Sequence, residues 1–155
     1  MSIFVKAPQG VTVPDGMRID EPGPDVPEHI RAFFGKTGKW WGTWTSPQVK
    51  GSYDAILVIQ RIVNEEKVRI AYFTSAFPKW YIEESVWETT AQFVKREDGK
   101  TILRIPYDPS HTHIECWFAG KEFRGIMYGR FMVSRIVWKP YSTSLPESYI
   151  TPSGN

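Results

Sequence analysis

Apolar and polar residues alternate with a period of two from Lys39 to Lys139, and short clusters of turn-forming residues interrupt the alternation. This period is typical of β-strands, in which successive side chains point to opposite faces of a sheet. Short connections such as Asn64-Glu65, Glu97-Asp98-Gly99 and Ala119-Gly120 predict hairpins between them. The pattern predicts eight strands, at residues 39–46, 53–63, 66–75, 85–96, 100–106, 111–118, 121–129 and 131–139.

Eight strands joined mainly by hairpins are more than one open sheet of a chain of 155 residues usually carries. Closure into a barrel removes the two exposed sheet edges. We therefore expect an all-β fold, an eight-stranded antiparallel up-and-down barrel. The longer connection at residues 76–84, which contains Pro78 and Trp80, crosses between two of its strands.

The segments that flank the barrel lack this alternation. Residues 1–26 contain four Pro and three Gly, and they predict an extended N-terminal arm. Residues 25–35 predict a short helix that Asp25 or Val26 caps and Gly35 ends. The barrel domain is expected over residues 27–141, and an irregular tail over residues 142–155.

Some predicted strands are apolar on both faces, as in Ala55-Ile-Leu-Val-Ile59. In a small barrel one face lines the interior and the other normally meets water. A strand of this kind therefore predicts an outer cover, provided by the arm, by the helix or by a second subunit in a homodimer.

The composition narrows the function classes. Aromatic residues make up 15% of the chain, an excess that suits strands and small-molecule cavities. The net charge of +2 and the scattered Lys and Arg residues argue against nucleic acid as a partner. No apolar run has the length of a membrane-spanning helix or of a signal peptide, and the single Cys116 excludes an intrachain disulfide. We expect a soluble, cytoplasmic protein.

The segment Phe34-Gly35-Lys-Thr-Gly38-Lys39-Trp40-Trp41-Gly42-Thr43-Trp44 resembles the entry to calycin barrels, the group that includes the lipocalins. In that group a helical turn leads into a Gly-x-Trp at the first strand, and Gly38-Lys39-Trp40 and Gly42-Thr43-Trp44 both match it. The resemblance implies a small-molecule cavity, and a base at which Trp40 or Trp44 forms a plug. It also implies that a basic residue of the last strand packs over this Trp. Arg135 is the first candidate for this role, and Arg130 and Lys139 are the next candidates.

A barrel that holds a small, largely apolar molecule needs aromatic and apolar side chains on inward-facing strand positions. Trp44 occupies such a position, and Tyr128, Arg104 and Arg69 are candidates to orient a polar group of the ligand. No cofactor is predicted. The residues expected to contact the ligand are Tyr72, Trp87, Phe93, Phe123, Tyr128 and Trp138.

The cluster His111-Thr-His113-Ile-Glu115 offers an alternative, because its two imidazoles and its carboxylate share one face of a strand. Such a set could hold a metal, or act as acid and base in a cofactor-independent isomerase, cyclase or hydrolase. The competing interpretation, which we favour, is a solvated outer face with Ile114, Cys116 and Phe118 pointing inward. It predicts no metal site. A third alternative is a structural or interaction module with a filled interior.

Overall fold

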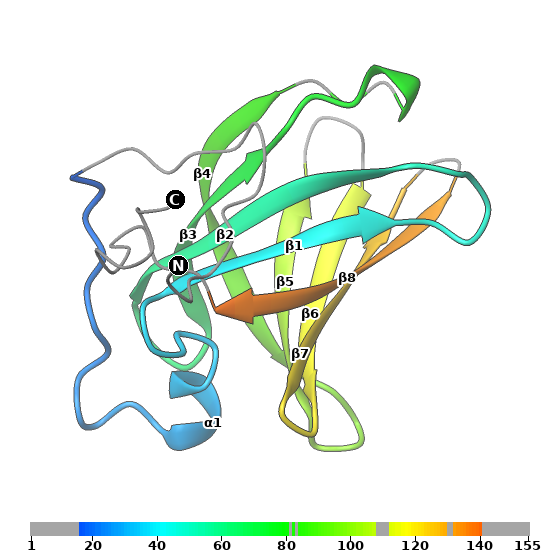
Figure 1. Ribbon diagram of the computed structural model, residues 1–155. Helices are drawn as coiled ribbons and strands as arrows, with labels where there is room; N and C mark the ends of the chain where they lie inside the picture. The colour runs from blue at the N-terminus through cyan, green and yellow to red at the C-terminus, as the bar shows by residue number, and fades with distance from the viewer. Residues whose placement is uncertain (1–15, 81, 83, 108–111, 130–131, 141–155) are drawn as a thin grey trace, which may run out of the picture.

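The structure, a computed structural model, describes residues 16–80, 82, 84–107, 112–129 and 132–140. Eight antiparallel strands close into a barrel in which each strand pairs with the next and the last pairs with the first, so the predicted barrel is confirmed (Figure 1). The strands are β1 (Lys39–Thr45), β2 (Ser52–Ile62), β3 (Lys67–Thr74), β4 (Ser85–Lys95), β5 (Thr101–Tyr107), β6 (Thr112–Ala119), β7 (Glu122–Tyr128) and β8 (Val133–Pro140). Over this described part of the chain, no helix has the length and apolar character that a membrane crossing needs.

The helix is much shorter than predicted. Helix α1 spans only Glu28–Arg31, and its N-cap is Pro27, which offers no side-chain hydrogen bond. After Arg31 the backbone tightens, because the amides of Phe33, Phe34 and Gly35 donate to carbonyls three residues back. A four-residue helix followed by turns thus replaces the predicted helix over residues 25–35.

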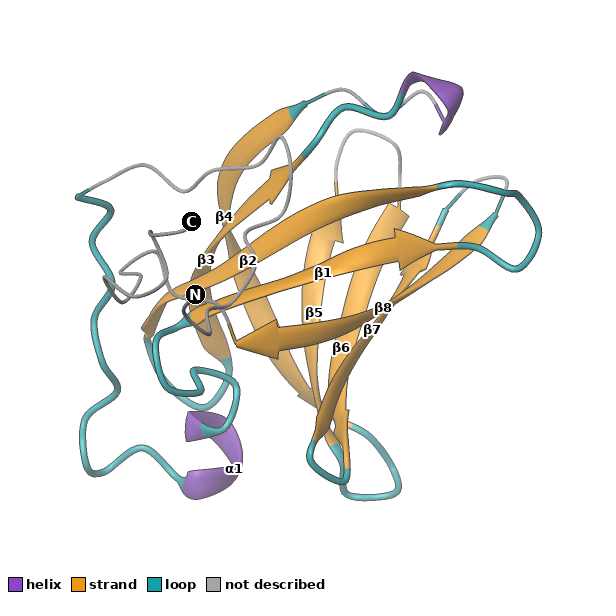
Figure 2. Ribbon diagram, in the orientation of Figure 1, coloured by secondary structure: helices purple, strands orange, loops and turns teal. Residues whose placement is uncertain are grey.

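The turns after α1 close one end of the barrel, which we call the base (Figure 2). Phe33 lies at the centre of the closure, with its ring 5.2 Å from that of Phe93 and 5.6 Å from that of Phe123. Trp40 packs on Phe123 at 4.7 Å, and its indole N–H donates to the Phe33 carbonyl at 3.0 Å. Trp40 is therefore the tryptophan at the base, whereas Trp44 lies further along the lumen.

The basic residue expected over this Trp is not found at the base. Positions 134, 136 and 138 of β8 are buried and face the interior, so Arg135 and Lys139 point outward and are exposed. The backbone carbonyl of Phe33 takes the place of a basic side chain as the polar partner of Trp40. Arg130 lies outside the described residues.

The arm covers the doubly apolar strands. Met17 and Ile19 pack with Trp41 against the outward-facing apolar cluster Ile56, Val58, Ala71 and Phe73 of β2 and β3. The Asp20 amide fixes the arm by donating to the Gln60 carbonyl at 2.8 Å. Of the three covers that the sequence allows, the arm lies on this face, and the homodimer stays a prediction.

The connection between β3 and β4 lies at the end of the barrel opposite α1 (Figures 1 and 2). It contains a short 3-10 helix, η1 (Pro78–Trp80), and a bridge between Phe77 and Ile82. The rings of Tyr53, Phe77 and Trp80 pack together here at centroid distances of 5.1–6.1 Å. The Trp80 indole N–H donates to the Lys50 carbonyl at 3.2 Å and ties this connection to the start of β2.

Candidate functional site

The middle of the lumen is packed with side chains, and two glycines leave the space that these side chains occupy. A Cβ on Gly125 would lie 2.8 Å from Ile136 Cγ2 and 2.9 Å from Trp138 Nε1, and one on Gly42 would lie 2.6 Å from Ile136 Cγ1. Such distances are far below ordinary van der Waals contact, so a side chain at either position would displace its neighbours. The middle of the lumen is therefore tightly packed around Gly42 and Gly125.

Above this packing, Trp44 and Tyr72 face each other inside the barrel. The Trp44 indole N–H donates to the Tyr72 hydroxyl oxygen at 2.8 Å, and both side chains are fully buried. The ring of Trp138 lies 6.0 Å from that of Trp44, and the ring of Trp87 lies 5.0 Å from that of Tyr72. These rings form a floor and one wall of the upper lumen.

Strand β4 pairs unequally with its two neighbours. It pairs with β3 from Ser85 to Gln92, but with β5 only through Gln92–Lys95 and Thr101–Arg104. Pro106, two residues beyond the last pair, has no backbone N–H and cannot donate to a ladder. The halves of β4 and β5 that lie toward the open end are therefore not hydrogen-bonded to each other.

This unpaired half of β4 carries two inward-facing residues that water reaches. Residues 86, 88, 90 and 92 are exposed on the outer face, which places Trp87 and Thr89 on the inner face. Both remain partly exposed, whereas Ala91 and Phe93, further along the same face where the ladder holds, are buried. Water thus reaches the inner face of β4 in the upper lumen, and we take this region as the candidate site.

The polar character of this site is sparse. Ser134 faces inward from β8 at 4% exposure, and Thr89 faces inward from β4. Among the described residues that face the upper lumen, including Trp44, Tyr72, Trp87, Thr89 and Ser134, none carries a charge. The site therefore combines aromatic walls with a few hydroxyl groups, which sequence reasoning missed because isolated Ser and Thr residues are common on either face of a strand.

The structure brings only some of the predicted ligand residues together. Tyr72 and Trp87 lie in the upper lumen, and Trp138 lies below them in the packed middle. Phe93 and Phe123 belong to the base, where both rings pack against Phe33.

Tyr128 does not line the lumen. It is 42% exposed on the outer face, because Phe123, Gly125 and Met127 are the inward residues of β7. Arg104 is exposed, and Arg69, on the outer face of β3, donates to the Thr90 hydroxyl at 2.7 Å. The expectation that these three polar residues face the ligand is therefore wrong.

The described acid–base residues of the histidine cluster, His113 and Glu115, lie on the outside, as the favoured interpretation predicted. Ile114 and Cys116 are fully buried, while His113 and Glu115 point outward with 3.5 Å between Nε2 and Oε2. The His113 ring stacks on Tyr128 at 5.1 Å. His111 is not among the described residues, and within those that are, no three His, Cys, Asp or Glu side chains gather as metal ligands.

Cys116 is a buried thiol inside the packed region. Burial raises its pKa to about 12, the nearby indole N–H of Trp138 opposes this shift, and the charge of Glu115 adds to it. The indole N–H makes no hydrogen bond of regular geometry to the sulfur. A thiol that stays protonated at neutral pH is a poor nucleophile, so Cys116 is a packing group.

No protein-family model, no curated protein and no solved structure matches the chain. The calycin resemblance of the Trp-rich segment around Trp40 and Trp44 stays a prediction.

Proposed function

We propose that the protein binds a small, largely apolar molecule in the upper lumen of its barrel. The observation that carries this proposal is the partial exposure of the inward-facing Trp87 and Thr89. Both residues lie in the part of β4 that does not pair with β5. A filled barrel would bury both residues as completely as it buries Ala91. Space at an otherwise well-packed aromatic wall is what a small-molecule site needs.

The chemistry of the site favours a neutral ligand. Its walls are the rings of Tyr72 and Trp87, with Ile105 and Ile114 fully buried on neighbouring inner faces. An ionised ligand would lose its hydration there without gaining a charged partner, which is costly. A hydroxyl such as that of Ser134 can instead donate to a carbonyl or ether oxygen of the ligand.

The packed layer of Trp44, Trp138 and Ile136 limits the maximum size of the ligand, because it closes the lower side of the upper lumen. The ligand can occupy only the part of the lumen above this layer. We therefore expect a compact molecule of two or three rings rather than a long acyl chain.

An enzymatic function draws no support from the described side chains. That hypothesis depended on an acid and a base at the rim of the lumen, and His113 and Glu115 lie on the outer face instead. The binding function therefore remains the better supported of the two.

Titration with phenylnaphthylamine, an uncharged probe that fluoresces in apolar sites, tests the proposal. Thr89→Phe places a ring in the site and should weaken probe binding about tenfold or more, whereas Thr90→Phe, the same change on the outer face, should leave it within about twofold. Equal affinities of both folded variants and the parent would contradict a site in the lumen. If the probe binds as expected, native mass spectrometry of the protein as expressed can identify a natural ligand that co-purifies with it.

A further inference from the structure

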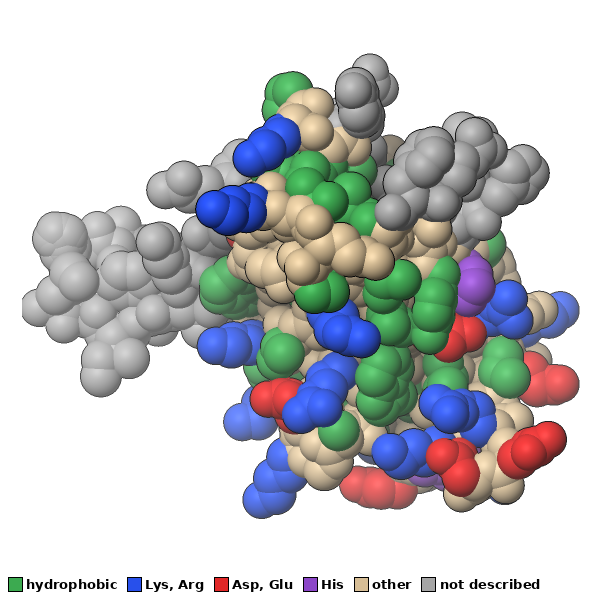
Figure 3. Space-filling model, turned by 90° about the vertical axis from the view of Figure 1, so that its right-hand side faces the viewer, with side chains coloured by type: hydrophobic (Ala, Val, Ile, Leu, Met, Phe, Trp, Pro, Cys, Tyr) green, Lys and Arg blue, Asp and Glu red, His purple; other side chains and the backbone are tan. Residues whose placement is uncertain are grey.

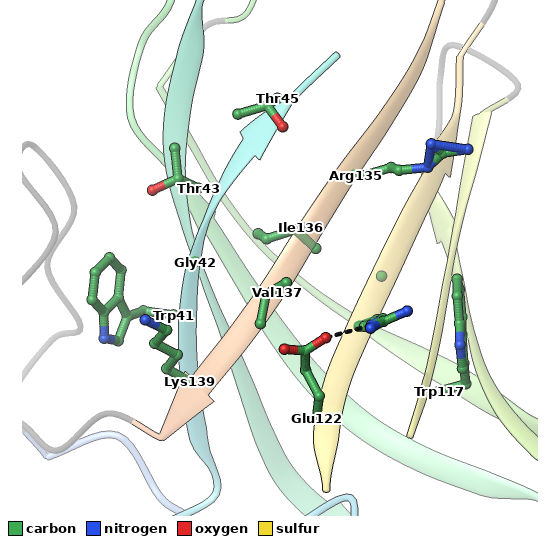
Figure 4. Close-up of a pocket in the computed structure, with 12 residues that line it drawn as sticks. Trp41, Gly42, Thr43, Thr45, Trp117, Glu122, Arg135, Ile136, Val137 and Lys139 are labelled. Atoms are coloured by element: carbon green, nitrogen blue, oxygen red, sulfur yellow. Dashed lines mark hydrogen bonds and ion pairs between the residues drawn. The ribbon is translucent and has the colours of Figure 1, made fainter. Parts of the chain in front are cut away.

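A second hollow lies on the outer face of the barrel, over β1, β8, β7 and β6. It has a cavity volume of about 530 Å³. It is lined by Gly42, Gly125 and Ile136 together with outward-facing side chains of the four strands. Figure 4 shows the labelled residues of this lining. We call it the outer groove, with Trp41, Trp117, Arg124, Arg135, Val137 and Lys139 as its principal side chains.

The strand register aligns the apolar part of the outer groove. Val137 on β8 lies opposite Arg124 on β7, and Arg124 lies opposite Trp117 on β6. Val137 is 40% exposed and the Trp117 ring is only partly buried, so both present apolar surface to solvent. On the side of the barrel where β6, β7 and β8 lie, hydrophobic side chains gather in the middle of the face, with Lys, Arg, Asp and Glu around them (Figure 3).

The charge of the outer groove is positive and only partly neutralised. Glu122 pairs with Arg124. Arg135 and Lys139 flank Val137 at two residues on either side along β8, so their side chains share its face about 7 Å away in each direction (Figure 4). Neither makes an ion pair with a described carboxylate, which leaves two cations beside the exposed Val137.

We propose that the outer groove binds a small organic anion. The flat apolar body of this ligand packs against Trp117 and Val137, and its carboxylate, sulfonate or phosphate group contacts Arg135, while Lys139 adds positive charge from the other side of Val137. An Arg guanidinium offers two parallel donors to such an oxyanion, and Lys adds a compact positive charge. Trp117 supplies a planar surface on which an aromatic ring gains contact area at little entropic cost.

A small molecule fits better than a protein segment. A volume of about 530 Å³ lies within the range of small-molecule sites. Because the barrel is closed, an extended peptide finds no free strand edge to pair with on this face. Charge complementarity with Arg135 and Lys139 then requires that the molecule be an anion.

This site differs from the upper lumen in both place and chemistry. The side chains of Arg135 and Val137 point away from the lumen, and those of Ile136 and Trp138 point into it. A neutral ligand suits the lumen, and an anion suits the outer groove. The two sites can therefore be tested independently with two probes of nearly the same shape.

Anilinonaphthalene sulfonate is such a probe, since it is phenylnaphthylamine with one added sulfonate. In the double variant Arg135→Gln/Lys139→Gln its affinity should fall about tenfold or more, and binding to the unaltered protein should weaken as salt is added. The matched control Arg61→Gln/Lys95→Gln removes two exposed cations of other strands and should change the affinity by less than about twofold. Trp117→Leu should weaken binding of the sulfonate and leave binding of phenylnaphthylamine unchanged.

Two results would overturn the outer groove as an anion site. One is equal affinity of the sulfonate for the groove variant and the control variant, both folded by circular dichroism. The other is loss of sulfonate binding in Thr89→Phe, which would place the anion in the lumen. Failure of the lumen proposal would appear separately, as absent phenylnaphthylamine binding with sulfonate binding retained. Displacement of the sulfonate by a short oligoglutamate at lower concentration than by naphthalene sulfonate would identify an acidic chain as the occupant and also refute the proposal.

Discussion

The indole nitrogen of Trp44 on β1 donates a hydrogen bond of 2.8 Å to the phenolic oxygen of Tyr72 on β3, with both residues fully buried. The bond spans the lumen past β2, between residues 28 positions apart in the chain. Trp138 lies on one side of the pair and Trp87 on the other. The pair therefore forms the boundary between the packed middle of the barrel and the accessible upper lumen.

Removal of the Tyr72 hydroxyl should destabilise the fold more than its size implies. Tyr72→Phe leaves the Trp44 N–H buried without this acceptor, and the cost of such a donor is about 1–3 kcal/mol in the free energy of unfolding. Urea denaturation followed by tryptophan fluorescence measures this loss. Tyr128→Phe removes the same atom from the exposed outer face and should change the free energy of unfolding by less than about 0.5 kcal/mol. A Tyr72→Phe variant as stable as Tyr128→Phe would show that the bond contributes nothing to stability.

Addition of one methyl group inside the barrel at Gly125 should also be destabilising. The added carbon would meet Ile136, Trp138 and Cys116 at 2.8, 2.9 and 3.4 Å. Overpacking of this kind costs about 1–3 kcal/mol. Gly125→Ala is therefore expected to lower the urea midpoint, with an unchanged slope. An unaltered midpoint would mean that space remains in the middle of the lumen, which would enlarge the candidate site downward.

The eight strands could be predicted from the sequence because their signal is local. Alternation marks each strand, and turn residues mark its ends. Asn64, for example, accepts hydrogen bonds from the amides of Glu66 and Lys67 at 2.7 and 2.8 Å and so builds its own turn. Such devices depend on a few neighbouring residues. The predicted length of the helix was wrong because it depends on tertiary packing. Residues 25–35 have residue types that suit a helix, but Phe33 and Phe34 pack into the base, and the backbone there forms turns.

The candidate site was predicted only in part, because period two assigns residues to a common face without saying which face points inward. Phe123 and Tyr128 are five positions apart on one strand, so they cannot share a face, and this parity would have excluded one of them. The separation of β4 from β5 depends on register between strands, which no local pattern records. Pro106 is a local indication of this separation, because proline cannot donate a hydrogen bond to the neighbouring strand.

The arm makes a further prediction about stability. Ile19 packs against the outer apolar cluster of Ile56, Val58, Ala71 and Phe73, so Ile19→Ser should lower the free energy of unfolding by about 1–2 kcal/mol. Arg18→Ser is the matched control, because the Arg18 side chain is 87% exposed and forms an ion pair with Asp20 at the surface. Thermal denaturation of both variants compares them directly. Equal losses would mean that the arm does not shield this cluster in solution.

Cys116 should make stability depend on pH in the alkaline range. Burial raises the pKa of its thiol from 9.0 to about 12, so the folded protein keeps a proton that the unfolded chain releases above about pH 9. Between these two values the unfolded state binds fewer protons, and the free energy of unfolding should fall by up to about 1.4 kcal/mol per pH unit. Urea denaturation of the parent and of Cys116→Ala at about pH 8 and about pH 10.5 isolates this contribution, since the other titrating groups are common to both. The parent should lose more stability than Cys116→Ala over that interval, and parallel losses would show that the thiol ionises as readily in the folded barrel as in the unfolded chain.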